Sequence, residues 1–457
     1  MVPVEKNKEY ELKIESVTSE GMGVSHIDGF CVFVAKTAPE DVVLAHILKV
    51  NKGYAYAKIS KIITPSPYRV TPPCQSFSAC GGCQLMHIDY DQQLKIKKNI
   101  IEDALFRIGK LNIKVDEMIG ADSHFRYRNK MIFPVGTDKS GKKICGFYKE
   151  RSHEIVPLED CLLGDEINSE IIKRVMDFIE KYKISVYNEE QHKGLIRRLF
   201  IRYGYHSKEI MVVLSVNAKT LPHYDEFAKI IKDISPRIKS VVLNFNTKKT
   251  NVCLGDTNAL LFGNETINDT LCQMEYEISP HSFFQINPVQ TQKLYNKAIT
   301  LADIKKTDVV MDLYCGIGTI SLCASRFSKK VIGVEIVEQA ILDARKNAEK
   351  NSVDNVEFYA SDVSVLVPKL ICNGERPDVV ILDPPRKGSD NKTLSSIITA
   401  EPKKIVYISC NPSTLARDLN FLCENGYEVK NLVGVDMFPQ TMHIECCVLL
   451  SLEENQK

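Results

Sequence analysis

The stretch Asp312-Leu-Tyr-Cys-Gly-Ile-Gly-Thr319 follows a short apolar run and indicates the fold of the C-terminal part of the chain. Gly316 and Gly318 let the backbone approach a ligand closely. Glu335 ends the next predicted strand, where a carboxylate can accept hydrogen bonds from a ribose. A dinucleotide-binding fingerprint requires a third glycine at position 321, which is Ser321. The pattern therefore favours a nucleoside ligand without a pyrophosphate, namely S-adenosylmethionine.

Strand-like and helix-like runs alternate from about residue 287 onward. The candidate strands are 309–313, 331–335, 356–359, 379–383 and 404–409, with helical stretches such as 338–351 and 414–425 among them. This alternation predicts a parallel, doubly wound sheet. Asp362 falls just beyond the third strand, at the edge where Glu335 ends the second. Two further runs, 429–435 and 444–450, leave no room for a helix between them, so we expect an antiparallel hairpin at the edge of the sheet.

Three side chains are expected to converge on one edge of this sheet. Asp383 ends the fourth strand, in Asp-Pro-Pro-Arg386, and Cys410 ends the fifth, in Ser-Cys-Asn-Pro412. The carboxyl ends of parallel strands border the ligand crevice. A cysteine shortly before a helix N-terminus also has the environment of a nucleophile. Glu445 opens the last strand and would begin at the same edge if that strand runs antiparallel.

Residues 1–64 differ in pattern from the rest of the chain. Short alternating runs such as 10–14, 30–34, 42–50 and 54–59, with glycines at hairpin spacing, predict a small all-β barrel. Prolines at positions 65, 67, 72 and 73 mark a boundary. The region that follows mixes strand-like runs, 198–203 and 209–216, with helical ones such as 165–182, which predicts an α+β arrangement.

Three closely spaced cysteines, Cys74, Cys80 and Cys83, follow this boundary in a turn rich in proline and glycine. Such a turn can aim several sulfurs at one centre. Cys161 is the best distant candidate for a fourth ligand, and Cys145 stays open as an alternative. Four thiolates suit an iron–sulfur cluster or zinc, although zinc sites more often show two short cysteine pairs.

Composition excludes a membrane-spanning or disordered chain. The 457 residues are 44% hydrophobic and 26% charged, without an apolar run of 18 residues. Charged residues within the first ten positions leave no apolar stretch for a signal peptide. We therefore expect a cytoplasmic protein whose 15 cysteines are thiols or ligands rather than disulfides.

The net charge of +1 excludes a uniformly basic surface but permits a local one. In the middle region, basic and aromatic side chains interleave, which is the combination that single-stranded RNA binding requires. They are Phe125, Arg126, Tyr127, Arg128, Lys130, Lys193, Arg197, Arg198, Phe200, Arg202, Phe245, Lys248 and Lys249.

Taken in order along the chain, the motifs ending at Thr319, Gly388, Thr414 and Cys446 resemble those of the RNA uracil-5-methyltransferases, and the segment from Ser279 to Asn287 resembles the family's entry to its catalytic domain. The resemblance covers nearly the whole chain and implies three domains. Residues 1–64 would form a TRAM domain, an OB-like RNA-binding barrel. Residues 65–89 and 120–278 would form a central α+β domain, and residues 90–119 and 279–457 a Rossmann-like class I methyltransferase domain with a doubly wound sheet.

The resemblance also implies roles for individual residues. Cys410 would add to C6 of the uracil, and Glu445 would be the general base that removes the C5 proton. The positions that match binders of S-adenosylmethionine are Gln285, Tyr314, Glu335 and Asp383. Phe283 matches the aromatic residue that stacks near the substrate base. Cys74, Cys80, Cys83 and Cys161 match the ligands of a 4Fe-4S cluster.

The expected substrate is a folded RNA that presents a loop or an extruded base, because a uridine inside a helix hides its C6. A barrel together with a cluster resembles the 23S rRNA enzymes more than the tRNA enzyme, so 23S rRNA is the predicted partner of a monomer that does not bind membranes. Two alternatives stay open: the same chemistry on tRNA, and a catalytically silent RNA-binding protein. A radical S-adenosylmethionine enzyme is disfavoured, because five residues rather than three separate Cys74 from Cys80.

Overall fold

The computed structural model describes residues 2–453. At the N-terminus, six strands form one sheet in the order β1-β5-β6-β4-β3-β2. Alternating residues such as Val32, Val34, Val43 and Ala45 point inward and are fully buried, which confirms the predicted small β-rich domain. The strands are β1 (Glu9–Lys13), β2 (Ser16–Val17), β3 (Met22–Ile27), β4 (Phe30–Ala35), β5 (Val42–Val50) and β6 (Tyr54–Thr64).

The central region is a seven-stranded mixed sheet in the order β10-β9-β8-β11-β12-β13-β14. The helices α2 and α3 pack on one face through residues such as Phe178 and Phe227. The opposite face, with Phe200 and Met211, joins the core of the C-terminal part. The elements are β8 (Lys130–Thr137), β9 (Lys143–Tyr148), β10 (Ile155–Pro157), α2 (Ile167–Lys181), β11 (Ile196–Tyr203), β12 (Ile210–Val216), α3 (Tyr224–Lys232), β13 (Ile238–Phe245) and β14 (Thr257–Gly263).

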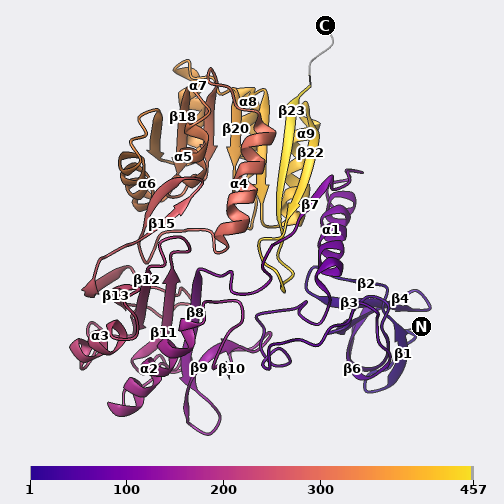
Figure 1. The fold of residues 1–457 in the computed structure, drawn as a ribbon. Helices are drawn as coiled ribbons and strands as arrows, with labels where there is room; N and C mark the ends of the chain where they lie inside the picture. The colour runs from indigo at the N-terminus through magenta and orange to yellow at the C-terminus, as the bar shows by residue number, and fades with distance from the viewer. Residues whose placement is uncertain (1, 454–457) are drawn as a thin grey trace.

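The C-terminal part is an eight-stranded sheet in the order β19-β18-β17-β20-β21-β23-β22-β7 (Figure 1). Its strands are β7 (Glu117–Ile119), β17 (Val309–Leu313), β18 (Lys330–Glu335), β19 (Val356–Ala360), β20 (Val379–Leu382), β21 (Lys404–Ser409), β22 (Tyr427–Val435) and β23 (Glu445–Leu452). The hairpin β15 (Ile267–Leu271) and β16 (Met274–Ile278) leads into this part. The strands from β19 to β21 are parallel, and β23 is antiparallel to both of its neighbours. The sequence therefore predicted the doubly wound sheet correctly.

Helices cover both faces of this sheet. One face carries α4 (Pro288–Ala302), α5 (Thr319–Ser325) and α6 (Glu338–Lys350). The other carries α7 (Val363–Cys372), α8 (Asn391–Ala400), α9 (Pro412–Glu424) and α1 (Tyr90–Arg107). None of the helices in residues 2–453 combines the length and the apolar character that crossing a bilayer demands.

The position of the hairpin corrects one expectation. β22 and β23 do pair antiparallel, but β22 is not an edge strand, because β7 (Glu117–Ile119) pairs with it in parallel from Val433 to Val435. A short segment from upstream of the central sheet thus covers the edge, which protects the backbone groups of β22 from pairing with another chain.

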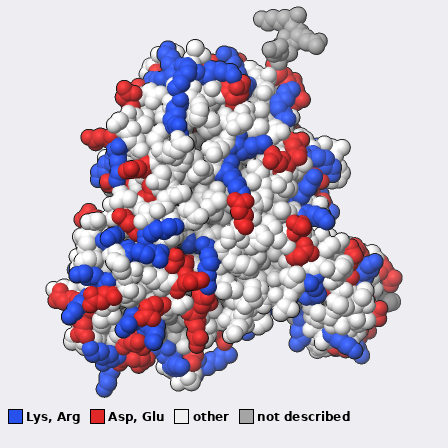
Figure 2. Space-filling view, in the orientation of Figure 1, with Lys and Arg blue, Asp and Glu red and all other residues white. Residues whose placement is uncertain are grey.

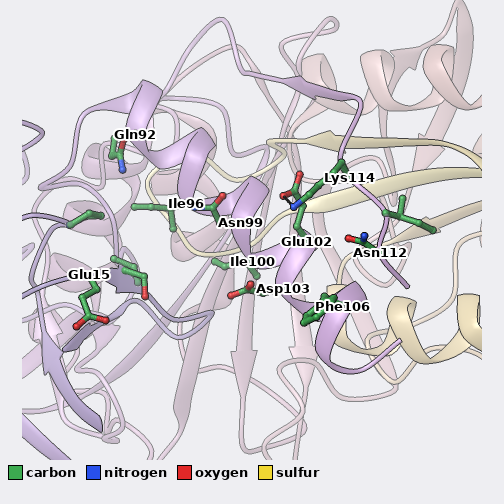
Figure 3. A pocket seen from close by; sticks show the side chains of 14 residues that line it. Glu15, Gln92, Ile96, Asn99, Ile100, Glu102, Asp103, Phe106, Asn112 and Lys114 are labelled. Atoms are coloured by element: carbon green, nitrogen blue, oxygen red, sulfur yellow. Dashed lines mark hydrogen bonds and ion pairs between the residues drawn. The ribbon is translucent and has the colours of Figure 1, made fainter. Parts of the chain in front are cut away.

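The barrel meets α1 across an open cavity of about 500 Å³, lined by Glu15 and Pro39 on the barrel side and by Ile96, Asn99 and Asp103 on the helix (Figure 3). Beside it, a small apolar cluster joins the two. The cluster contains Val17, Ala38, Leu85, Ile88, Ile96 and Met442. The barrel therefore packs against a segment that also contacts the end of the C-terminal sheet.

Candidate active site

One cavity of about 590 Å³ opens at the carboxyl ends of β17, β18, β20 and β21. It lies where the strand order of the sheet reverses, between β17 and β20, which is the usual ligand position in doubly wound folds. Most of the residues singled out from the sequence line it: Phe283, Gln285, Tyr314, Gly316, Glu335, Asp362, Asp383, Cys410 and Glu445. The fold thus brings together side chains that are up to 162 residues apart, from Phe283 to Glu445.

The loop after β17 is shaped by residues with left-handed backbone. Tyr314, Gly316 and Gly318 have φ of 68°, 55° and 82°. A Cβ built on Gly316 meets no atom within 4 Å, whereas one on Gly318 lies 2.8 Å from Phe358 Cζ. Gly316 therefore keeps the cavity clear for a ligand. Gly318 does not line the cavity, and its lack of a side chain is required by packing.

Two acids at the strand ends already have structural hydrogen bonds. Glu335 Oε2 accepts from the Gly316 backbone N–H at 3.3 Å, and its Oε1 accepts from Val337 at 3.0 Å. Asp362 caps the N-terminus of α7, where its Oδ1 accepts from the Ser364 backbone at 2.8 Å. These bonds fix both carboxylates at the rim of the cavity.

Cys410 and Glu445 are brought together by the register of β21 and β23. The last paired residues are Ser409 and Cys446, so the next position on each strand is Cys410 and Glu445. Glu445 is buried, at 3% exposure, and its Oε2 has no hydrogen-bond partner within residues 2–453. Such an unpartnered buried oxygen is costly and points to a ligand or a reacting group.

Burial and like charge perturb this group of acids. Burial raises the pKa of Asp383, and burial and the nearby Asp383 carboxylate together raise the pKa of Glu445 well above its usual range. Burial, Glu445 and Asp383 raise the pKa of the Cys410 thiol to about 11. The Arg386 guanidinium acts in the opposite direction on Cys410 and Glu445. Perturbed groups that converge in one cavity are typical of catalytic sites.

Comparison with known proteins agrees with this geometry. The family described as tRNA (Uracil-5-)-methyltransferase matches residues 89–364 and 374–453, and the TRAM domain matches residues 3–60. The chain belongs to this methyltransferase family. Its reaction class is therefore methyl transfer to uracil C5 in RNA with S-adenosylmethionine as the donor.

Two curated relatives match nearly the whole length of this methyltransferase. Two proteins named uncharacterized RNA methyltransferases, from Clostridium tetani and Halalkalibacterium halodurans, are 43% and 44% identical to it and cover 100% and 99% of the chain, with 99% and 98% of their own length. The solved structure of the Pyrococcus abyssi tRNA (uracil-54, C5)-methyltransferase in complex with S-adenosyl-L-homocysteine is 30% identical. It superposes with a TM-score of 0.77 over 96% of this chain and 100% of that one.

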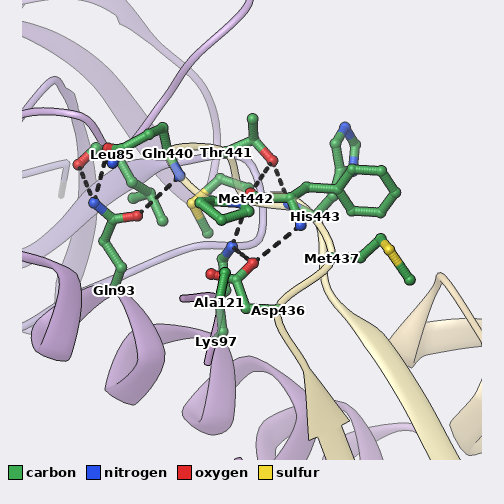
Figure 4. A network of polar contacts seen from close by, with 12 residues as sticks. Leu85, Gln93, Lys97, Ala121, Asp436, Met437, Gln440, Thr441, Met442 and His443 are labelled. Atoms are coloured by element: carbon green, nitrogen blue, oxygen red, sulfur yellow. Dashed lines mark hydrogen bonds and ion pairs between the residues drawn. The ribbon is translucent and has the colours of Figure 1, made fainter. Parts of the chain in front are cut away.

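The loop that carries Phe438 and His443 into the cavity is held by α1, and this contact was not predicted from the sequence. Figure 4 shows Gln93 and Lys97 pointing from α1 toward this loop. Lys97 donates to Asp436 at 2.6 Å and to the Phe438 carbonyl at 3.1 Å, and Gln93 donates to Gln440 at 3.0 Å. A sequence signal existed, because Lys97 lies four residues before the fully buried Ile101 on one face of α1.

The four cysteines predicted to act as ligands line a second cavity, of about 240 Å³. Cys145 instead lies in the core of the central sheet. Burial raises the pKa of Cys83, Cys80 and Cys161. Within residues 2–453, no group of three or more His, Cys, Asp or Glu side chains closes around a point tightly enough for a single metal ion. Thiols that share one cavity are the ligand type that iron–sulfur clusters use.

Some residues of the predicted basic clusters are buried and have structural roles, whereas others are exposed. Figure 2 shows that Lys and Arg are interspersed with Asp and Glu over the visible face. Arg197, one member of the predicted basic cluster, is not available to RNA, because it is buried and donates to the carbonyls of Asn246, Lys248 and Thr250. Phe200 is also buried, in the core, so it cannot stack on a base. Sequence spacing could not reveal this, because Arg197 is covered by the segment 246–250 and Phe200 by the C-terminal part.

Proposed function

We propose that this protein methylates C5 of a specific uridine in 23S rRNA through a covalent adduct between Cys410 and C6 of the base. The observation that carries the proposed chemistry is the juxtaposition of Cys410 and Glu445 in a cavity at the switch point of the sheet, and the choice of 23S rRNA rests on the family resemblance. A nucleophile on one side of a pyrimidine ring and a base near the other are the two groups that the reaction needs.

C5 of uracil is a weak nucleophile until something adds to C6. The Cys410 thiolate would form a bond to C6, and the electron pair of the C5–C6 double bond would move toward the C4 carbonyl, giving an enolate. S-adenosylmethionine supplies the methyl group that the nucleophilic C5 takes up. Glu445 would then accept the C5 proton, and the electron pair of that C–H bond would restore the double bond and expel Cys410 as a thiolate.

The electrostatics of the cavity suit these two roles. A carboxylate whose pKa is raised holds a proton firmly, so Glu445 in its ionised form is a strong acceptor for the C5 proton. Cys410 needs help to ionise because its pKa is about 11. Arg386 supplies part of that help, because its positive charge lowers the pKa of Cys410.

For the methyl donor, we propose a site formed by Gln285, Tyr314, Glu335, Asp362 and Asp383, with Gly316 leaving space for it. Phe283 would stack near the target base, since its ring is 61% exposed at the cavity. Gly318 would act only through the shape of the loop.

We further propose a 4Fe-4S cluster held by Cys74, Cys80, Cys83 and Cys161, which line one cavity. We also propose the domain boundaries predicted from the sequence. Their support is that α1 packs in the same core as α9 and that β7 pairs with β22. The protein would act as a cytoplasmic monomer.

Transfer RNA is the second candidate substrate, and one observation favours it. The Pyrococcus abyssi tRNA enzyme superposes over 96% of this chain, which includes the N-terminal barrel region. The barrel therefore does not separate rRNA enzymes from tRNA enzymes, and the choice between the two RNAs rests on an assay.

The test is methyl transfer from labelled S-adenosylmethionine to unmodified 23S rRNA fragments and to unmodified tRNA transcripts, followed by nucleoside analysis. Label recovered as 5-methyluridine from the ribosomal fragments, and lost in Cys410→Ala, supports the proposal. Label in tRNA alone keeps the chemistry and rejects the rRNA substrate. Label in neither RNA rejects both.

A further inference from the structure

Two cations face each other at the seam between the central sheet and the active site. Lys130 on β8 and Arg202 on β11 are directly paired in the antiparallel register. Like charges in this position repel and destabilise a sheet. Among the described residues, no carboxylate forms an ion pair with either side chain, and only the Cys253 side chain partly offsets the repulsion at Lys130.

Burial makes this arrangement more costly. Arg202 is 4% exposed, and its Nε has no acceptor within residues 2–453, although one Nη donates to the Ser282 carbonyl at 2.8 Å. Burial lowers the pKa of Arg202 to about 9, and burial together with Arg202 lowers that of Lys130 to about 8. A buried cation beside a half-buried one gains no stability without a counter-charge, so an anion that joins them would relieve the cost.

The pair lies directly beside the active-site cavity. Asn129, next to Lys130, donates its backbone N–H to the Ile286 carbonyl and its side chain to the Gln285 carbonyl, both at 2.9 Å. Lys130 Nζ lies 6.0 Å from the centre of the exposed Phe283 ring. The ammonium group therefore stands where the segment 282–286 forms the wall of the cavity.

We propose that Lys130 Nζ, assisted by the field of Arg202, binds a phosphodiester group of the RNA next to the uridine that enters the cavity. This inference rests on the proposed function. An extruded nucleotide carries its backbone with it, so a phosphate must lie near the ring on which the base stacks. Phe283 and Lys130 provide an aromatic surface and a cation side by side, the combination that single-stranded RNA binding uses. Arg202 acts only through its charge, because its Nε is enclosed.

The experiment measures binding of a fluorescein-labelled uridine hexamer by fluorescence anisotropy between 50 and 300 mM KCl. The proteins compared are the wild type, Lys130→Gln, Lys130→Arg and the control Lys173→Gln, which removes an exposed lysine on α2. Loss of one phosphate contact should weaken binding roughly tenfold and flatten the plot of log affinity against log salt by about 0.7. Lys130→Arg should retain the slope. Lys130→Gln should keep or raise the melting temperature, since it removes a like charge beside the buried Arg202.

The outcomes are distinct. Weaker binding and a flatter slope in Lys130→Gln alone support the phosphate site. Wild-type affinity and slope in Lys130→Gln overturn the proposal. An equal loss in Lys173→Gln also overturns it, because the effect of Lys130 would then be one of overall charge. If the wild type binds the hexamer with the Lys130-dependent slope but methylates no RNA, the phosphate site stands and the proposed function fails.

Discussion

Lys97 and Asp436 lie 339 residues apart in the chain and meet as a fully buried ion pair, with 2.6 Å between Nζ and Oδ1. Asp436 also accepts from the Tyr90 hydroxyl at 2.9 Å and from the Phe438 backbone at 3.1 Å. The pair therefore ties α1 to the loop between β22 and β23, immediately before the strand that carries Glu445.

Removing one partner of this pair should be strongly destabilising. Lys97→Met leaves the Asp436 carboxylate buried without its counter-charge, and we expect a loss of about 3–5 kcal/mol in the free energy of unfolding. Urea denaturation measures it. The exposed neighbour Lys98, whose contact with Glu102 is 3.8 Å, provides the control, and Lys98→Met should cost less than about 1 kcal/mol. If Lys97→Met loses no more stability than Lys98→Met, then water reaches the Asp436 carboxylate.

Glu445→Gln should separate the two halves of the proposed reaction. A glutamine cannot accept the C5 proton, so addition of Cys410 and methyl transfer would proceed but elimination of the thiolate would stall. We expect a covalent complex between protein and RNA on a denaturing gel, together with turnover reduced by about 10²–10⁴-fold. Cys410→Ala should form no such complex. Normal turnover in Glu445→Gln would assign the base to another residue.

Asp312 should make the stability of the ligand-free protein depend on pH. It is fully buried, and burial raises its pKa to about 7, despite a hydrogen bond from Ser321. Because the folded pKa lies above the unfolded value, the stabilising contribution is complete below about pH 4 and is lost as pH rises through about 7. Asp312→Asn should thus gain stability over the wild type from pH 5 to pH 8, by up to about 4 kcal/mol.

Thermal melting at a series of pH values tests this expectation. Asp354 is exposed, and Asp354→Asn provides the matched control, which should show a constant offset. A parallel pH dependence of wild type and Asp312→Asn would mean that Asp312 stays ionised in the folded protein.

The two glycines of the β17 loop should respond differently to alanine. In Gly316→Ala the new methyl group enters open space, so the protein should fold with a loss of about 1 kcal/mol from its positive φ and bind S-adenosylhomocysteine more weakly. In Gly318→Ala the methyl group meets Phe358 at 2.8 Å, and this overpacking should lower the free energy of unfolding by a further amount of about 1–3 kcal/mol. Calorimetric titration and urea unfolding separate these effects. Unchanged affinity in Gly316→Ala would remove that loop from the cofactor site.

The choice between Cys161 and Cys145 can be made by iron analysis. Cys161 lines the cavity with Cys74, Cys80 and Cys83, whereas Cys145 is buried in the core. Protein purified without oxygen should contain about four iron and four sulfide ions per chain. Cys161→Ser should lose both, and Cys145→Ser should retain them. If the wild-type protein contains zinc but no sulfide, the proposed iron–sulfur cluster is wrong and these cysteines bind a different metal.

Local patterns in the sequence determined the sheet and the edge where the proposed ligand site lies. The strands β17, β18, β20 and β21 are short apolar runs separated by helix-length segments, and that alternation depends only on neighbours along the chain. Asp383 and Cys410 follow directly from it, because they end two of those runs. The motifs also indicated the family without knowledge of any contact.

Tertiary structure alone decided which polar residues are buried and which partners they meet. Glu445 reaches Cys410 only through the register of two antiparallel strands, and β7 joins the sheet from more than 300 residues away. Arg197 and Lys97 look like surface cations in the sequence, yet both are buried. The physical reason is that the cost of burying a charge is set by the elements that cover it and the partner they supply, and both come from distant parts of the chain.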